Sequence, residues 1–249
     1  MSSTFSLTLK DILEIKPEVV VLPWGATEAH NYHLPYSTDV TEAFEVAAQS
    51  CEIANSKGAK TVCYPAVPFG ANAQQLDQHI TVSLSVKTMY AILEDVCTSL
   101  TKQGVKKLVI YNFHGGNEFK PFIRDLMGKF EVFILLIDAF RMIPEEVDEI
   151  FDVPGDHAGE LETSLMMYIK GNISKSEAGE GKRNDYNLNA LSESGIWSPR
   201  PWSKIHPDTG SGNPVLADAE KGKKYFERLT EKTAEIFLEL SNTPFERLP

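Results

Sequence analysis

VVVLPW (residues 19–24) runs directly into GATEAHNYHLPYSTD (residues 25–39), and this junction decides the fold. The first stretch is almost continuously apolar and rich in β-branched residues, which is typical of a strand covered on both faces. The second stretch concentrates histidine and carboxylate side chains. Ligands of α/β proteins bind outside the carboxyl ends of the strands. The junction therefore predicts a buried strand that leads into a functional site.

The rest of the chain repeats this pattern of strands and helices. Three further apolar stretches read as buried strands: residues 61–67 (TVCYPAV), 107–113 (KLVIYNF) and 132–139 (VFILLIDA). Five stretches carry apolar residues at helical spacing: residues 41–57, 85–103, 117–129, 161–169 and 218–240. Strands that alternate with helices predict an α/β fold, with a mainly parallel central sheet and helices on both sides.

Composition limits the classes of partner. The 249 residues carry 24 basic and 35 acidic side chains, a formal charge of −11. This charge argues against nucleic acid or an anionic membrane as the partner. The three cysteines show no CxxC spacing, and the first residues show no secretory signal. A reducing compartment is the simpler reading of the cysteines, so we expect a cytoplasmic protein.

We expect residues 1–249 to form one domain, with a long loop excursion at residues 171–214. The excursion is rich in Gly, Ser, Asn and Pro and shows no clean period. One reading is disorder, but it contains Trp197, Trp202 and His206, which are costly in a solvated linker. A loop of this length usually covers a site or meets a neighbouring subunit.

The first cluster of polar residues, within residues 25–39, resembles a metal site. Glu28 and His30 are two residues apart, so their side chains leave the same face of an extended segment. With Asp39 they offer carboxylate and imidazole ligands that suit Zn²⁺, Mn²⁺ or Fe²⁺. In the alternative reading His30 and His33 are surface residues, and Asp39 is a helix N-cap with Glu42 in the capping-box position.

The second cluster is HGGN, residues 114–117, at the end of a predicted strand. Gly115 and Gly116 allow a substrate to approach the backbone closely, and a following helix start offers free N–H groups. Alternatively, this is a strand-to-helix turn capped by Asn117.

The third cluster, HAGELETS (residues 157–164), again precedes a helical pattern. In the alternative reading Glu160 is a first-turn acid favoured by the helix dipole. Three clusters of histidine and carboxylate at strand ends and helix starts favour a shared site over three coincidences.

These three segments resemble the creatininase (creatinine amidohydrolase) family. GATEAHNYHLPYSTD, HGGN and HAGELETS occur here in the order of the family's motifs, within a resemblance over most of residues 10–170. The resemblance implies a three-layer α/β/α sandwich, a site for two divalent metal ions (Zn, Mn or Fe) and often a hexamer.

The resemblance also implies roles for the metal ligands. Glu28 and His114 look like ligands of one metal, His30 like a ligand of the other, and Asp39 like the bridging carboxylate. In creatininase a Glu two residues after the second-cluster histidine completes the second metal, but this position is Gly116 here.

Another carboxylate must therefore complete the second site if two metals bind. Glu162 is the first choice and Glu160 the second, and a one-metal site is the alternative. His157 occupies the place of the family's catalytic histidine, so we predict His157 and Glu162 as catalytic residues. Two cations would activate a water against the amide, and His157 would pass a proton to the departing nitrogen.

The predicted activity is metal-dependent hydrolysis of a C–N bond in a small amide or cyclic amide. The substrate-facing segments at residues 69–75 and 152–154 depart from creatininase, so we predict that creatinine is not the main substrate. Relatives that share HGGN act as formamide hydrolases of pyrimidine intermediates or as a peptidase. Asn72, Gly115 and Gly116 are candidate substrate contacts, with Gln74 a weaker one. A non-catalytic metal- or ligand-binding subunit is the alternative from another class.

Overall fold

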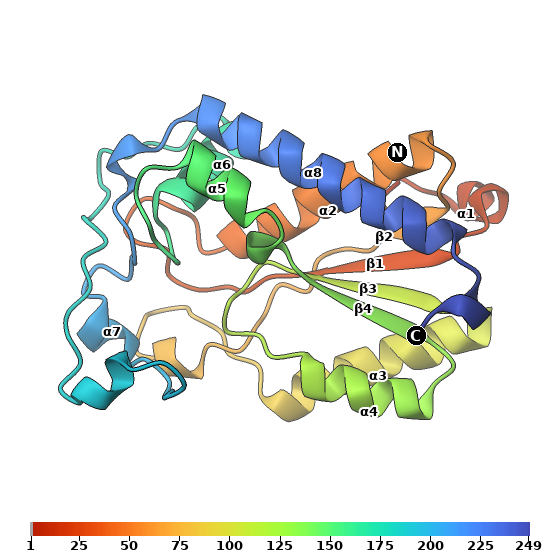
Figure 1. Ribbon diagram of the computed structural model, residues 1–249, viewed down its shortest axis with the longest axis horizontal. Coiled ribbons are helices and arrows are strands. Elements are labelled where there is room, and N and C mark those ends of the chain that lie inside the picture. Colours follow the sequence, from red (N-terminus) through yellow and green to blue (C-terminus); the bar gives the residue numbers. More distant parts are fainter. Residues whose placement is uncertain (1) are drawn as a thin grey trace.

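A computed structural model describes residues 2–249. Its helices and strands follow the predicted alternation (Figure 1). The strands are β1 (Val19–Trp24), β2 (Thr61–Cys63), β3 (Lys107–Asn112) and β4 (Phe133–Asp138). The helices are α1 (Leu9–Ile15), α2 (Thr38–Ser56), α3 (Val86–Gln103), α4 (Lys120–Lys129), α5 (Pro144–Ile150), α6 (Glu160–Lys170), α7 (Trp202–Ile205) and α8 (Ala219–Asn242).

The four strands form one parallel sheet in the order β2-β1-β3-β4. Trp24 pairs with Asn112, and Asn112 pairs with Asp138. The carboxyl ends of β1, β3 and β4 therefore lie level along one edge of the sheet. The loops that follow these strands meet at that edge.

Helices cover both faces of the sheet, as the alternation of side chains along the strands requires. Val19 and Val21 face a core shared with α2 and α8, whereas Val20 and Leu22 face a core shared with α3 and α4. Helices α5 and α6 lie on the same side as α8 (Figure 1). The predicted three-layer α/β/α sandwich with a parallel central sheet is confirmed.

Two predicted boundaries were wrong. The strand predicted over residues 61–67 ends at Cys63, because Pro65 has no N–H to continue the ladder. Pairing resumes only at an isolated bridge between Trp24 and Val67. The helix predicted from residue 117 begins at Lys120.

Three helices of the described chain were not predicted: α1, α5 and the four-residue α7, which lies within the excursion. Helix α1 begins at a capping box formed by Thr8 and Asp11, but it buries none of its residues. Helix α5 begins with Pro144, which is well suited to the first turn of a helix. Within residues 2–249 no helix is both long and apolar enough to cross a bilayer.

Candidate metal centre

The first cluster lies on the loop between β1 and α2. A Cβ atom at Gly25 would come within 2.5 Å of the Val40 nitrogen, so only glycine lets the strand end pack against the start of α2. The helix begins at Thr38 after Ser37 in the cap position, so Asp39 is not the N-cap. Its carboxylate instead lies among histidines, and the alternative reading of this segment was wrong.

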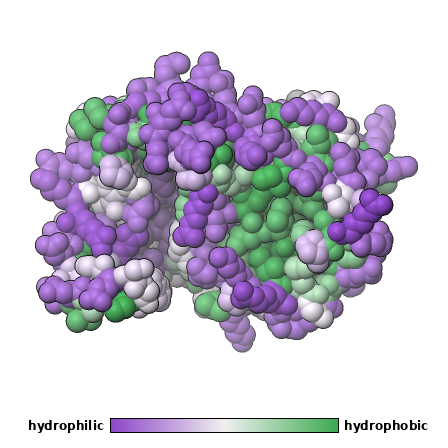
Figure 2. All heavy atoms as spheres, in the orientation of Figure 1, coloured by the Kyte–Doolittle hydropathy of each residue, from purple (hydrophilic) through white to green (hydrophobic). Residues whose placement is uncertain are grey.

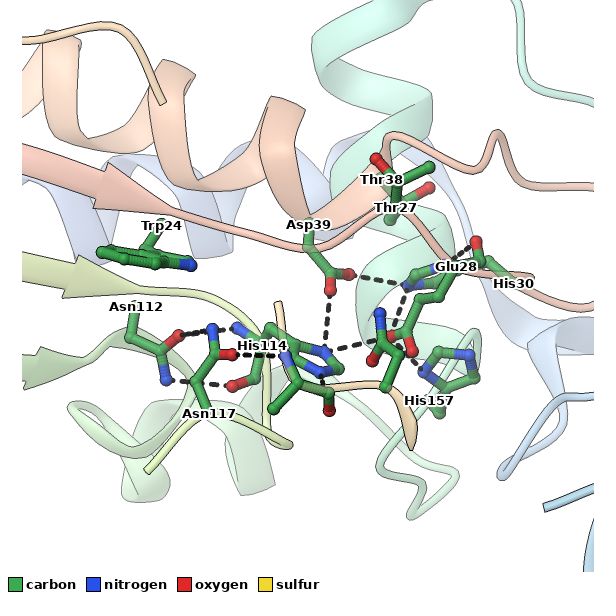
Figure 3. A network of polar contacts seen from close by, with 12 residues as sticks. Trp24, Thr27, Glu28, His30, Thr38, Asp39, Asn112, His114, Asn117 and His157 are labelled. Carbon is green, nitrogen blue, oxygen red and sulfur yellow. Dashed lines mark hydrogen bonds and ion pairs between the residues drawn. The ribbon is translucent and has the colours of Figure 1, made fainter. Parts of the chain in front are cut away.

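Glu28, Asp39, His30 and His114 form a compact buried group (Figure 3). His30 Nε2 lies 2.7 Å from one carboxylate oxygen of Asp39. His114 Nδ1 lies 3.0 Å from the other Asp39 oxygen and 3.0 Å from Glu28 Oε1. The two imidazoles therefore face two carboxylates, and residues from β1, α2 and the end of β3 meet at one point.

Each histidine of the centre is held by a main-chain carbonyl. His30 Nδ1 lies 3.1 Å from the Glu28 carbonyl oxygen, His114 Nε2 lies 3.3 Å from that of Ala71, and His157 Nε2 lies 2.8 Å from that of Ala29. A carbonyl oxygen only accepts hydrogen bonds, so these ring nitrogens carry the hydrogens. In the neutral rings the other nitrogen then presents a lone pair to the carboxylates.

Lone pairs that face carboxylate oxygens need a positive charge between them. Burial is the largest single influence on the pKa of His30, and it lowers that pKa. The Asp39 carboxylate, with smaller contributions from Glu162 and Glu28, has the larger combined effect and raises the pKa to about 10. The pKa of His114 is likewise raised despite burial, by Glu28 and Asp39. Either protons or a cation can balance this cluster.

The donor atoms fit a divalent metal. Three groups place one ligand atom per residue within 4.8 Å of one another: Glu28 with His30 and His157, Glu28 with Asp39 and His114, and His30 with Asp39 and Glu162. His30 Nε2 and Asp39 Oδ2 are buried, and neither makes a hydrogen bond while the imidazoles are neutral, because a ring lone pair then faces each Asp39 oxygen. Imidazole nitrogens held by carbonyls at their far side are the usual arrangement at zinc and manganese sites.

The two candidate acids of the third cluster have different surroundings. Glu160 accepts hydrogen bonds from the backbone N–H groups of Asp152 and Val153, at 2.9 and 2.7 Å, and pairs with Lys221. Glu162 accepts one from the Ala158 N–H and groups with His30 and Asp39. Only Glu162 thus faces the centre.

The HGGN turn is held by its asparagine. Asn117 Oδ1 accepts a hydrogen bond from the Ala71 N–H at 3.0 Å, and its Nδ2 donates to Asn112 Oδ1 at 3.0 Å. Asn117 therefore ties the turn to a neighbouring loop and does not cap α4, which follows Phe119. A Cβ atom at Gly116 would lie 2.5 Å from the Ala71 carbonyl oxygen, so this backbone has no room for the glutamate of creatininase.

Two cavities meet at the metal centre. They have volumes of about 590 Å³ and about 850 Å³, and both are lined by Glu28, His114 and His157. Gly115 lines both cavities, while Gly116 and Gln74 line the larger one. Figure 2 shows the surface hollowed left of its centre, between the part that the excursion forms and the rest of the molecule.

Residues of the excursion form one wall of the larger cavity. Trp202 is buried and packs edge to face against His157, with the ring centres 5.1 Å apart. Trp202 also stacks on His206. Trp197 lines the same cavity but is 82% exposed.

Asn72 lies apart from the other candidate residues. It is fully buried and donates to the Val82 carbonyl oxygen at 3.2 Å, and it lines neither cavity. Its neighbour Gln75 instead donates a hydrogen bond to Glu28 Oε2. Sequence reasoning missed Gln75, and also Arg141, which lines both cavities. The sequence did contain a signal for Arg141, because it lies just after the fourth strand, where functional residues of α/β proteins gather.

Comparison with known proteins identifies relatives of this chain. A Bacteroides fragilis NCTC 9343 protein assigned as a creatinine amidohydrolase has a crystal structure that matches with a TM-score of 0.91 and 38% identity, covering 97% of each chain. A Mycobacterium ulcerans (strain Agy99) mycofactocin precursor peptide peptidase is 24% identical over 85% of this chain and 81% of its own. Pseudomonas putida creatinine amidohydrolase is 27% identical over 61% of this chain and 64% of its own.

Solved creatininases share the fold at lower identity. A mutant structure of the Zn-Zn type and a Mn structure each match with a TM-score of 0.74 and 19% identity. The family model described as creatinine amidohydrolase matches residues 6–237. The chain thus belongs to the creatininase family.

Proposed function

We propose that this protein is a metal-dependent amidohydrolase that cleaves a C–N bond of an amide substrate. The observation that carries the proposal is the set of three buried histidines, each anchored to a carbonyl at one ring nitrogen and turned at the other toward the buried carboxylate of Glu28 or Asp39. Family membership, and the Zn-Zn and Mn forms of solved creatininases, support divalent ions at this place.

The ligand roles follow from which atoms point at one another. Glu28 and His114 would hold one ion, His30 and Glu162 the other, and Asp39 would bridge them because its two oxygens face different imidazoles. Bound ions supply the Lewis acidity that activates water and polarises an amide carbonyl.

His157 is suited to move a proton at the reacting centre. Its Nε2 hydrogen is held by the Ala29 carbonyl oxygen, so Nδ1 is the free nitrogen, 3.7 Å from Glu28 Oε1. We assign it the transfer of a proton through Nδ1 to the departing nitrogen. Packing against Trp202 fixes the ring plane. Gly115 and Gly116 would let the amide approach the backbone closely, and a role for Asn72 stays a prediction that its position does not favour.

The substrate need not be creatinine. The two cavities together extend well beyond the space that a small cyclic amide fills, and volumes of this order accommodate larger ligands. The mycofactocin peptidases among the relatives make a linear, peptide-like amide the second candidate. A formamide of a pyrimidine intermediate is a third.

The test counts metal and measures hydrolysis on the same preparations. We expect about two Zn or Mn ions per chain, and cleavage of at least one member of an amide panel by the metal-loaded protein. Glu162→Gln should lose one ion and most activity. Glu160→Gln is the matched control and should keep both ions, because Glu160 pairs with Lys221.

The same measurements can also contradict the proposal. A chain that takes up no metal on titration has no activated water, and the binding-subunit alternative then leads. Bound metal without hydrolysis of any amide, peptide or formamide would also favour that alternative.

We further propose three properties, of which the family resemblance suggests the last. The chain would act as one domain, its excursion would cover the site, and its copies would assemble into a homo-oligomer, which light scattering can test. The three buried, unpaired thiols support a cytoplasmic location.

A further inference from the structure

Arg141 is an exposed charged side chain at the metal cavities, and no carboxylate of the described chain forms an ion pair with it. It ends the short 3₁₀ turn Ala139–Arg141 that follows β4, at the carboxyl edge of the sheet. It lines both cavities, alongside Glu28 and His114. Its guanidinium lies 5.5 Å from the centre of the Phe140 ring, and within residues 2–249 no carboxylate lies within ion-pair distance of it.

Other cations at these walls are already used. Arg200 Nη1 lies 3.0 Å from Asp156 Oδ2, and its guanidinium stacks over Trp202 at 4.4 Å. Lys221, behind the smaller cavity, pairs with Asp152 and Glu160. These two positive charges therefore pair with acidic groups of the protein, and no ligand is needed to explain why they are there.

Arg183 resembles Arg141 more closely. It lines the larger cavity from the excursion, on a different wall, and stacks over Tyr186 at 4.8 Å. In the described chain it also has no carboxylate partner. Two guanidinium groups without ion pairs thus lie on the wall of one cavity, although the protein carries a net charge of −11.

The acids near Arg141 do not account for it. Glu118 lines the larger cavity and Asp148 the smaller one, yet neither is within ion-pair distance of Arg141. Arginine presents donors in a planar fork that matches carboxylate and phosphate oxygens. A free fork beside a metal centre is suited to fix an anionic group near the reacting amide.

We propose that the substrate is an anionic amide, with a carboxylate or phosphate that Arg141 binds and that Arg183, which lines the same cavity from the excursion, supports. This proposal rests on the proposed amidohydrolase function and names its substrate class. Such a substrate would be positioned by its anion at one end and by the metal centre at its amide. The neutral ring of creatinine offers no such group.

The test compares two probes that differ only in charge: N-acetyl-L-phenylalanine, which has a carboxylate, and N-acetyl-L-phenylalaninamide, which has none. Isothermal titration calorimetry on metal-loaded protein should show the carboxylate binding about tenfold tighter, as expected for a charged hydrogen bond. Arg141→Ala should remove this preference, and Arg141→Lys should keep part of it. Arg124→Ala, on the exposed side of α4, is the matched control and should keep all of it.

Phenyl phosphate distinguishes the two sources of the anion. If it binds tighter than the carboxylate probe and depends on Arg141, the natural group is a phosphate; otherwise it is a carboxylate. A preference that persists in Arg141→Ala would mean that the metals bind the anion, and the proposal fails. It also fails if both probes bind equally or the carboxylate does not bind.

This failure differs from failure of the proposed function. Hydrolysis of neutral and anionic amides at equal rates would leave the amidohydrolase standing and overturn the anionic substrate. Binding of the carboxylate through Arg141, without hydrolysis of any amide, would overturn the amidohydrolase and leave only an anion-binding site at Arg141.

Discussion

The two ends of the sheet bury charge in opposite ways. At the amino end, Lys107 at the start of β3 is buried, and its ammonium donates to the carbonyl oxygens of Leu240, Ser241 and Thr243 at 2.8, 3.2 and 2.7 Å. These carbonyls lie at the end of α8, where helix carbonyls lack partners. The protein therefore satisfies this charge by itself.

At the carboxyl end, the protein satisfies the buried carboxylates only in part: Gln75 donates a hydrogen bond to Glu28, and the rest depends on protons or a cation among the imidazoles. Asp39 and Glu28 face imidazole lone pairs, and His30 Nε2 is left without a hydrogen bond. A buried group without a partner costs stability, so it persists where function requires it. The comparison teaches that burial alone does not indicate a site, whereas burial without internal compensation does.

Asp39→Asn should produce the largest effect. It keeps the shape of the side chain but removes the charge that both imidazoles face. We expect activity on any cleaved amide to fall about a thousandfold, and metal content to fall with it. The fold should survive, because His30 and His114 can lose protons once the carboxylate is gone.

The control for Asp39 is Asp148→Asn on the wall of the smaller cavity. It removes the same charge without touching an imidazole, and activity should stay within about twofold. Equal losses in the two variants would show that general negative charge, and not the bridging position, matters.

Lys107→Met should affect the other end of the sheet and leave the site unchanged. Methionine keeps the packing of the stem but leaves three buried carbonyls without a donor. We expect the free energy of unfolding, measured in urea on metal-loaded protein, to fall by about 3 kcal/mol with metal content unchanged.

Lys106→Met is the matched control for this second variant. Lys106 is 41% exposed and pairs with Glu131 at the surface, so its removal should cost less than about 0.5 kcal/mol. A loss of metal in Lys107→Met would contradict the separation of the two ends.

Sequence alone could predict that the candidate metal ligands lie together, because each cluster is local. Each cluster directly follows a strand or begins a helix, and parallel strands bring their carboxyl ends to one edge. Glu28, His30 and Asp39 lie within twelve residues, so one loop positions all three. The family and the fold could be predicted because the motifs and the strand pattern are also local, and both predictions are confirmed.

What sequence could not supply depends on distant contacts. Glu160 and Glu162 look alike in sequence, and their roles are separated by the contacts of Glu160 with Lys221, about sixty residues away, and with the backbone of Asp152 and Val153. Gln75 reaches Glu28 through a loop without a period. Arg141 indicates an anion-binding role only because its surroundings in the structure contain no carboxylate at ion-pair distance, and the sequence does not show this.

The smallest effect should be a pH dependence that metal removes. In the metal-free fold His30 has a pKa of about 10, above the unfolded value of about 6.5, so its proton adds stability that is full below about pH 6.5 and is lost as the pH rises towards 10. His114 acts with the same sign, because its pKa is also raised. Glu42, whose pKa is raised by burial, Glu162 and Asp39, also lowers stability as the pH rises.

Chelator-treated protein should therefore melt progressively lower between about pH 6.5 and about pH 9. Metal-loaded protein should show a smaller slope, since liganded imidazoles are already deprotonated and no longer release protons in this range. His30→Gln should reduce the slope of the metal-free form toward that of the loaded one. Equal slopes with and without metal would mean that protons on His30 and His114 do not take the place of the metal in balancing the carboxylates at this edge of the sheet, and this account of the metal-free site would be wrong.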